Sequence, residues 1–141
     1  MIFTSNSDKE TKKIGQDLSR SFSGGDILLL YGELGAGKTT LVKGIAKGLG
    51  IDKEITSPTF SLMNIFEVKK RNFNKLIHID TYRLEKEQEL IQIGAEDYLG
   101  VPDAVVIVEW PEKMENLLKN KKVKKNRTEH SCSGRKITIE D

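Results

Sequence analysis

The segment that most constrains the fold is GELGAGKTT, residues 32–40, which directly follows an apolar run at residues 27–30. It contains the pattern G-x-x-x-x-G-K-[ST], with its two glycines at Gly32 and Gly37. Glycines allow a backbone to wrap around an anion, and the first turn of a following helix adds partial positive charge at the same place. A buried strand before the loop and a helix after it are the context in which this pattern indicates a phosphate-binding P-loop.

Two side chains at the end of this loop have expected roles in nucleotide binding. Lys38 would reach the outer phosphates, and the Thr39 hydroxyl would ligate Mg²⁺. We expect Lys38 to lie exposed at the start of the helix, where it contributes charge to the phosphates and little packing. The loop is therefore predicted to be a nucleotide site.

Nucleotide hydrolysis also needs a carboxylate at a strand end, because Mg²⁺ has to be held and the attacking water oriented. Two predicted strands end in an acid. Residues 104–108 are entirely apolar and lead to Glu109, the form of a Walker B strand, whereas residues 76–79 lead to Asp80. Either carboxylate could hold the metal while the other orients water, and each could instead be a helix cap or part of a surface ion pair.

Apolar periodicity predicts helices and strands that alternate along the chain. Helices are expected from a capping box at residues 7–10 to residue 22, and at residues 39–49, 85–98 and 112–118; strands are expected at residues 26–31, 60–68, 76–80, 104–108, 123–129 and 135–140. Ile91 is expected to point inward. The alternation predicts an α/β fold, a three-layer P-loop NTPase-like sandwich whose central sheet is mostly parallel with antiparallel additions.

Length and composition favour a single domain over residues 1–141. The net charge of +2 excludes a histone-like polycation, although 31% of the residues are charged. No window approaches 18 apolar residues and the first residues lack a signal-peptide pattern, so we expect no membrane contact. The single cysteine, Cys132, cannot form an internal disulfide, which fits a reducing cytosol. We therefore expect a cytoplasmic protein.

Four motifs together resemble the TsaE family of small bacterial P-loop ATPases, which act in making threonylcarbamoyladenosine in tRNA. They are GELGAGKTT, SPTF at residues 57–60, HIDTYRL at residues 78–84 and VEWP at residues 108–111. The motifs follow the order of the family. The resemblance implies ATP and Mg²⁺ as cofactors, TsaD and TsaB as protein partners, and contact with tRNA only indirectly through that complex.

The resemblance also implies a set of nucleotide-binding residues. The phosphates would be cradled by Gly35, Ala36, Gly37, Lys38, Thr39 and Thr40. Thr59 resembles the threonine of a switch loop that senses the γ-phosphate, and Thr11 matches a threonine near the base. Trp110 would lie beside the metal site and report nucleotide occupancy. From the residues alone, Thr11 could equally be a helical surface residue, and Trp110 a core or interface aromatic.

Metal binding and catalysis follow from the same resemblance. Thr39 and Glu109 would hold Mg²⁺, and Asp80 would be the catalytic or metal-linked carboxylate, with Lys38 assisting. Arg83 is the only further cation that the sequence offers near the site. We expect slow hydrolysis by the chain alone, and faster hydrolysis once docking on TsaD and TsaB orders residues 57–60.

Other functional classes fit less well. A GTPase would need an Asn-Lys-x-Asp base reader, which the sequence lacks. A small-molecule kinase would need an arginine-bearing lid and an acceptor pocket, and no long lid segment is evident. A nucleotide-gated binding module stays open, because turnover in the family depends on partners.

The strongly basic stretch at residues 119–128 contains six positive residues and no acid. Such a run attracts nucleic acid phosphates. It contains no aromatic residues for base stacking, so we favour a solvated turn and an edge strand, where lysines oppose aggregation. His78 is expected to be a packed or hydrogen-bonded histidine instead of a catalytic base.

Overall fold

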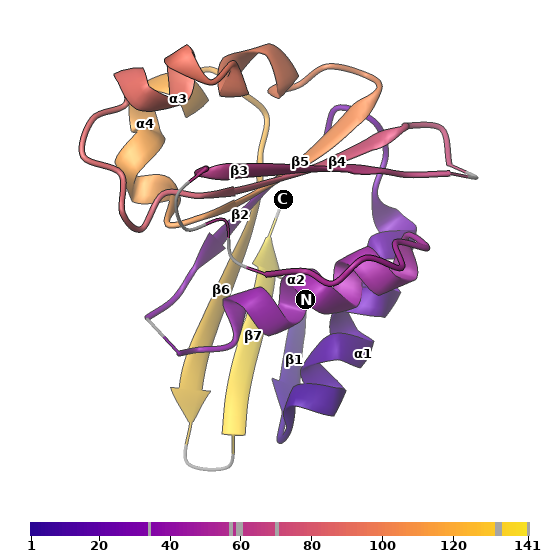
Figure 1. The fold of residues 1–141 in the computed structure, drawn as a ribbon. Helices are drawn as coiled ribbons and strands as arrows, with labels where there is room; N and C mark the ends of the chain where they lie inside the picture. Colours follow the sequence, from indigo (N-terminus) through magenta and orange to yellow (C-terminus); the bar gives the residue numbers. More distant parts are fainter. Residues whose placement is uncertain (34, 57, 59–60, 70, 132–133, 141) are drawn as a thin grey trace.

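A computed structural model describes residues 1–33, 35–56, 58, 61–69, 71–131 and 134–140 (Figure 1). Within this part of the chain, seven strands form one sheet in the order β1-β7-β6-β2-β5-β4-β3. The strands are β1 (Ile2–Ser5), β2 (Ile27–Tyr31), β3 (Met63–Glu67), β4 (Lys75–Asp80), β5 (Ala104–Glu109), β6 (Lys124–Ser131) and β7 (Gly134–Glu140). The four central strands β6, β2, β5 and β4 are parallel, and β1, β7 and β3 add antiparallel pairs.

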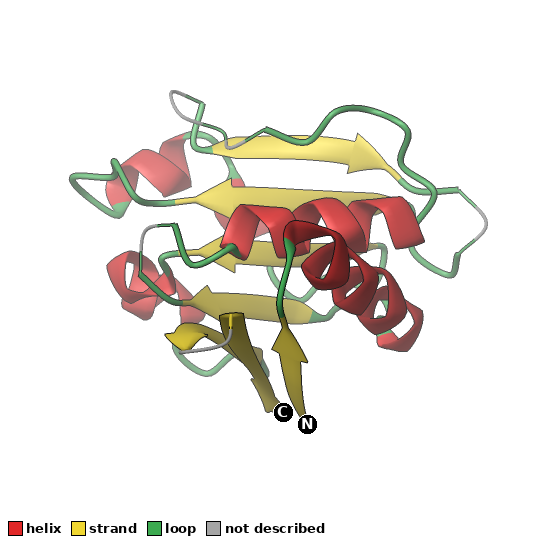
Figure 2. Cartoon of the chain, turned by 90° about the horizontal axis from the view of Figure 1, so that it is seen from below, coloured by secondary structure: helices red, strands yellow, loops and turns green. Residues whose placement is uncertain are grey.

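Helices cover both faces of this sheet (Figures 1 and 2). The α-helices are α1 (Asp8–Leu18), α2 (Lys38–Gly48), α3 (Gln88–Gln92) and α4 (Glu115–Leu118), and the 3₁₀ helices are η1 (Ser19–Ser21), η2 (Ala95–Tyr98) and η3 (Pro111–Met114). α1 and α2 pack together on one face, whereas α3 and α4 lie on the other. The predicted α/β class with a mostly parallel central sheet is confirmed.

The central strands are apolar on both faces because helices cover both faces. Leu28 and Leu30 of β2 belong to the core beneath α1 and α2. Ile27 and Leu29, which alternate with them, belong to the core beneath α3 and η2. β5 alternates in the same way between the two cores, and all six of its residues are buried. This two-sided burial explains why both strands are continuous apolar runs in the sequence.

Parallel pairing brings the carboxyl ends of the central strands to one edge of the sheet. Glu109 at the end of β5 is in register with Leu30 of β2 and with Asp80 of β4. The chain leaves β2 at this edge, passes through the glycine loop (residues 32–40) and enters α2. The predicted loop and both predicted acids are therefore adjacent.

The predicted helix over residues 85–98 is wrong in its extent. α3 covers five residues, and Gly94 follows it with a left-handed φ of 81° before η2 begins. A left-handed residue interrupts the helix geometry, so α3 and η2 are two separate short helices. Ile91, which was expected to point inward, is 49% exposed.

Pairing between the chain ends was not predicted. β1 pairs antiparallel with β7, and the amino group of Met1 donates to the carbonyl oxygen of Ile139 at 2.9 Å. β6 carries much of the basic stretch and lies between β7 and β2, so the expectation of an edge strand there is wrong. Ser133, expected in the hairpin turn, lies outside the described residues.

Candidate functional site

The glycine loop turns tightly into α2 at Gly37. Gly37 is the N-cap of α2 and has a left-handed φ of 102°. This backbone conformation favours glycine, and a Cβ atom here would lie 2.9 Å from the guanidinium carbon of Arg135, the end of a flexible side chain that would have to move. A pocket of about 230 Å³ lies over this turn. It is lined by Asp8, Gly35, Gly37, Lys38, Thr39, Thr40, Glu109 and Arg135.

Lys38 is buried, contrary to the expectation of an exposed side chain. Only 4% of its surface is exposed. Its Nζ donates to the carbonyl oxygen of Gly32 at 2.6 Å and lies 3.3 Å from the centroid of the Trp110 ring. Burial lowers the pKa of the Lys38 ammonium, and the nearby carboxylates of Glu109 and Asp80 oppose that shift. The cation is therefore held against an aromatic face and a carbonyl at the start of α2.

Trp110 follows Glu109 in an uncommon backbone conformation. It has a left-handed φ of 60°, which is rare for a residue other than glycine. The Thr81 hydroxyl bonds to the carbonyl oxygens of Glu109 and Trp110 and so braces this turn. The Tyr82 ring lies 5.1 Å from the Trp110 ring. Trp110 is thus half-buried at the edge of the site, in contact with Lys38.

Glu109 lies at the centre of a cluster of three side chains, in which Glu109 and His78 are buried and Thr39 is partly exposed. The Thr39 hydroxyl donates to Glu109 Oε1 at 3.1 Å, and His78 Nε2 lies 2.6 Å from Glu109 Oε2. Each of the three comes from a different element: α2, β5 and β4. We name Thr39, His78 and Glu109 the carboxylate cluster. Thr39 and Glu109, the two residues predicted to hold Mg²⁺, are thus hydrogen-bonded to each other.

Asp80 lies beside this cluster and is more open to solvent. It is in register with Glu109 on the neighbouring strand, and its Oδ1 accepts a hydrogen bond of 3.0 Å from the Tyr82 N–H. Burial raises the pKa of the Asp80 carboxyl, the Tyr82 N–H opposes the rise, and the Glu109 carboxylate adds to it. The two acids therefore differ in environment: Glu109 is buried and bonded to side chains, whereas Asp80 is partly open.

These residues fit an Mg²⁺ site in which the protein supplies some of the ligands, and water and substrate phosphates supply the rest. A hydroxyl and two carboxylates are the hard oxygen ligands that Mg²⁺ prefers, and it commonly takes its other ligands from water and substrate phosphates. Among the described residues, no group of three or more acidic, histidine or cysteine side chains could hold a metal by itself. Mg²⁺ at Thr39 and Glu109 would therefore need oxygen ligands beyond the protein.

Thr11 and Arg135 form a second polar cluster across the glycine loop. Thr11 is fully buried, so the reading of it as a helical surface residue is wrong. Its hydroxyl lies 2.7 Å from the Ser5 hydroxyl and accepts a 3.0 Å hydrogen bond from Arg135 Nη1. Arg135 Nη2 also pairs with Asp8 Oδ1 at 2.8 Å. We name Asp8, Thr11 and Arg135 the arginine cluster.

Arg135 is the residue of this site that sequence reasoning missed. It lies at the start of β7, far from the loop in sequence, and it reaches the loop because β7 pairs with β1 ahead of α1. The available signal was weak: Gly134-Arg135 in a tail with little else to compare. Arg83, the cation that the sequence did propose, is exposed after β4 and has contacts of its own.

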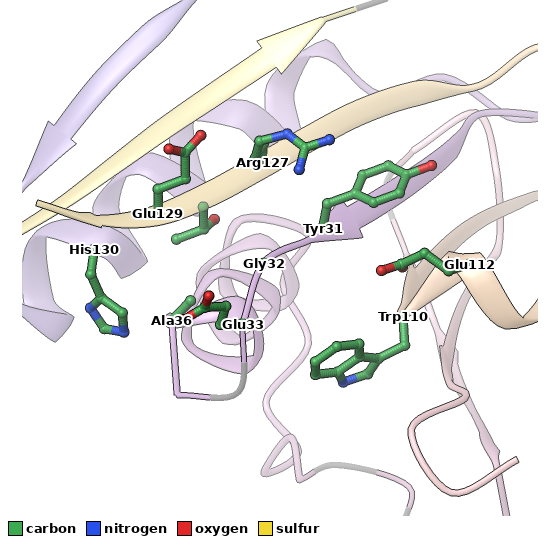
Figure 3. Close-up of a pocket in the computed structure, with 10 residues that line it drawn as sticks. Tyr31, Gly32, Glu33, Ala36, Trp110, Glu112, Arg127, Glu129 and His130 are labelled. Atoms are coloured by element: carbon green, nitrogen blue, oxygen red, sulfur yellow. The ribbon is translucent and has the colours of Figure 1, made fainter.

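A larger pocket of about 720 Å³ lies on the other side of the glycine loop (Figure 3). Its walls come from the end of β2, the glycine loop, the residue after β5, η3 and β6. It is lined by Tyr31, Gly32, Glu33, Ala36, Trp110, Glu112, Arg127, Thr128, Glu129 and His130. Gly32 and Ala36 thus form a wall of this pocket as well as part of the predicted phosphate loop.

Some residues predicted from the sequence lie outside the described part of the chain. Thr59, with its neighbours Ser57 and Phe60, lies outside the described residues, as does Cys132. Among the described residues, no helix is long and apolar enough to cross a membrane.

Comparison with known proteins identifies the family. The family model described as threonylcarbamoyl adenosine biosynthesis protein TsaE matches residues 5–137. The tRNA threonylcarbamoyladenosine biosynthesis protein TsaE of Nostoc is 42% identical over 76% of this chain and 66% of its own length. The protein of the same name from Treponema pallidum is 38% identical over 81% of each chain.

A solved structure agrees with this match. The crystal structure of Bacillus subtilis YdiB superposes with a TM-score of 0.79 and 28% identity, over 99% of this chain and 83% of YdiB. The glycine loop, Asp80 and Glu109 all lie within the region that the family model covers. This chain belongs to the TsaE family.

Proposed function

We propose that this protein is a Mg²⁺-dependent ATP-binding and ATP-hydrolysing subunit that supports the TsaD–TsaB complex in forming N6-threonylcarbamoyladenosine in tRNA. The convergence of Lys38, Thr39 and Glu109 at the start of α2, on a loop with the P-loop pattern, is the observation that carries the proposal. The names of the relatives supply the tRNA modification. Contact with tRNA is indirect, through the complex, and the protein acts in the cytoplasm.

The glycine loop and two cations bind the phosphates in this proposal. The backbone of residues 35–40, at the N-terminal end of α2, offers N–H groups and the helix dipole to the phosphates. Lys38 exchanges its bond with Gly32 for a phosphate oxygen. Arg135 adds a second positive charge at the pocket over Gly37. Because Lys38 and Arg135 lie at different places around the loop, they can contact different phosphate groups of one nucleotide.

Thr39 and Glu109 would hold Mg²⁺ against the phosphates, and Asp80 would lie beside the ion. Bound there, the ion would neutralise charge on the phosphate oxygens. Asp80 is the better candidate to orient water, because it is more open than Glu109 and burial raises the pKa of its carboxyl. Glu109 is the better candidate for the metal, because its bond to Thr39 fixes its orientation.

We infer that the isolated chain hydrolyses ATP slowly. Both Arg135 bonds, to Thr11 and Asp8, hold the guanidinium at the rim of the loop, and Lys38 is the cation beside the carboxylates. A further positive group at the γ-phosphate raises the rate of phosphoryl transfer by several orders of magnitude in other P-loop enzymes. The TsaD–TsaB pair is expected to complete the site, with Thr59 sensing the γ-phosphate.

Single-turnover hydrolysis of radiolabelled ATP, with and without TsaD–TsaB, tests this function. We expect Mg²⁺-dependent ATP binding by the chain alone, slow phosphate release, and a large acceleration by the pair. Equal rates in both conditions would make the domain an autonomous ATPase. Binding without turnover in either condition would favour a nucleotide-gated binding module.

One observation favours a second candidate, a small-molecule P-loop kinase. The larger pocket of about 720 Å³ shares Gly32 and Ala36 with the glycine loop, and it is large enough for a metabolite. A kinase would transfer the γ-phosphate to a compound bound there. Incubation of the isolated chain with radiolabelled ATP and pools of hydroxyl-bearing metabolites separates the two. A phosphorylated product formed without TsaD–TsaB would favour the kinase.

A further inference from the structure

His78 lies directly behind the carboxylate that is proposed to hold Mg²⁺. Its side chain is completely buried, and its Nε2 is 2.6 Å from Glu109 Oε2. The sequence predicted a packed or hydrogen-bonded histidine, and the hydrogen bond confirms this. Its partner, however, is the acid at the centre of the carboxylate cluster, so this bond can affect function as well as folding.

The strand geometry explains how His78 reaches Glu109. β4 and β5 are parallel neighbours, and Asp80 is in register with Glu109. His78 and Asp80 are two residues apart, so both point to the same face of the sheet, beneath the start of α2. Ile77 and Ile79 point to the opposite core. β4 therefore supplies a hydrogen-bond partner for Glu109, His78, and a second carboxylate next to it, Asp80.

The hydrogen bond fixes which nitrogen of His78 carries a proton. A carboxylate oxygen only accepts, so Nε2 donates to Glu109 Oε2. Nδ1 is buried and has no hydrogen-bond partner among the described residues. A proton on Nδ1 would therefore leave a buried N–H without an acceptor. The arrangement favours the imidazole with its single proton on Nε2.

Thr39 contacts both oxygens of the same carboxylate, and Oε1 is the nearer of the two. Its hydroxyl is 3.1 Å from Glu109 Oε1 and 3.4 Å from Oε2. The His78 bond thus holds Oε2 toward β4 and leaves Oε1 turned toward the N-terminal end of α2. This is the orientation that a metal held jointly by Thr39 and Glu109 requires.

We propose that His78 is a positioning residue for the magnesium site: by donating to Glu109 Oε2, it orients Oε1 toward Thr39 and the metal. The inference rests on the proposed function. Mg²⁺ demands near-ideal octahedral geometry, so a carboxylate free to rotate binds it less well. Partners that orient metal ligands typically contribute about 10- to 100-fold to metal affinity.

Two amide substitutions separate this role from simple packing. The side-chain nitrogen of Gln reaches about as far as Nε2, so His78→Gln keeps a donor for Glu109. His78→Asn places its nitrogen near the position of Nδ1, too short to reach. ATP is titrated calorimetrically against each variant with excess Mg²⁺ and with EDTA. The readout is the ratio of the two affinities, and thermal melting without nucleotide is recorded alongside.

We expect His78→Asn to reduce the Mg²⁺-dependent gain in ATP affinity by about 10- to 100-fold while the affinity in EDTA stays within about threefold. His78→Gln should recover most of the gain. The ratio is measured within each variant, so a lower melting temperature alone does not change it. If Mg²⁺ raises the ATP affinity of both variants as much as that of the wild-type protein, the positioning role is overturned. If the wild-type protein binds ATP with the same affinity in Mg²⁺ and in EDTA, the proposed function is overturned instead.

Discussion

The two polar clusters that flank the glycine loop differ in burial and in origin. The carboxylate cluster joins neighbouring strands to α2, and the side chains of His78 and Glu109 are almost fully buried. The arginine cluster joins the two ends of the chain, and 65% of the Asp8 side chain is exposed. Buried polar contacts act in a low dielectric, whereas exposed charges are screened by water and salt. We therefore expect the carboxylate cluster to set the metal chemistry, and the arginine cluster to tune nucleotide affinity.

The largest effect is expected between the two clusters, at Lys38. Lys38→Ala removes the cation next to Glu109 and Asp80, and with it the main attraction for the outer phosphates. The stabilisation of the protein by Mg²⁺–ATP in thermal melting should disappear. Without nucleotide the protein should lose the hydrogen bond to the Gly32 carbonyl oxygen, worth about 1.5–3 kcal/mol, and the contact with the Trp110 ring, worth about 0.5–2 kcal/mol.

Lys47→Ala provides a matched control for this experiment. Lys47 is an exposed lysine in the last turn of α2, away from the loop. Its replacement should leave the shift with Mg²⁺–ATP intact. An undiminished shift in Lys38→Ala would contradict the P-loop role of this lysine.

Substitutions of the two acids, Glu109 and Asp80, should affect different properties of the protein. Glu109→Ala should remove most of the Mg²⁺ dependence of ATP binding. It should also lower the free energy of unfolding by about 1–3 kcal/mol, because the buried His78 N–H loses its acceptor. Asp80→Ala should bind nucleotide with its Mg²⁺ dependence largely intact and lose turnover. Calorimetry and single-turnover hydrolysis measure the two properties, and reversed outcomes would exchange the roles of the acids.

A smaller effect is expected from the arginine cluster. Arg135→Ala should weaken ATP binding by about tenfold, the size of one charge-assisted hydrogen bond. The Mg²⁺ dependence should remain, because Arg135 bonds to Thr11 and Asp8, and neither of them belongs to the carboxylate cluster. Lys136→Ala, an exposed neighbour on β7, is the control. Loss of the Mg²⁺ dependence in Arg135→Ala would show that the clusters do not act separately.

The smallest effect is expected at Asp8. Its ion pair with Arg135 is exposed on the Asp8 side, and such pairs contribute about 0.2–1 kcal/mol. Asp8→Asn should therefore change ATP affinity by less than about fivefold, and the difference should vanish at high salt. Titrations at low and high ionic strength measure this. A large, salt-independent loss would mean that Asp8 contacts the nucleotide or holds Arg135 more firmly than its exposure indicates.

The sequence by itself determined the features that depend on neighbours along the chain. A continuous apolar run predicts a buried strand, and the glycine pattern after it predicts a turn into a helix; β2, the loop and α2 follow in that order. Glu109 and Asp80 were found because each ends a strand, and carboxyl ends of parallel strands meet at one edge. These patterns are local, so they are readable without the fold.

Only the tertiary structure decided the contacts between distant segments. The Trp110 ring packs against the Lys38 ammonium and helps to bury it. His78 is hydrogen-bonded to Glu109 because β4 pairs with β5. Arg135 reaches Gly37 because β7 pairs with β1. Each of these contacts depends on strand order and register, which side-chain periodicity does not encode. The sequence therefore indicates the candidate phosphate-binding residues, whereas the packing of the sheet decides which residues orient them.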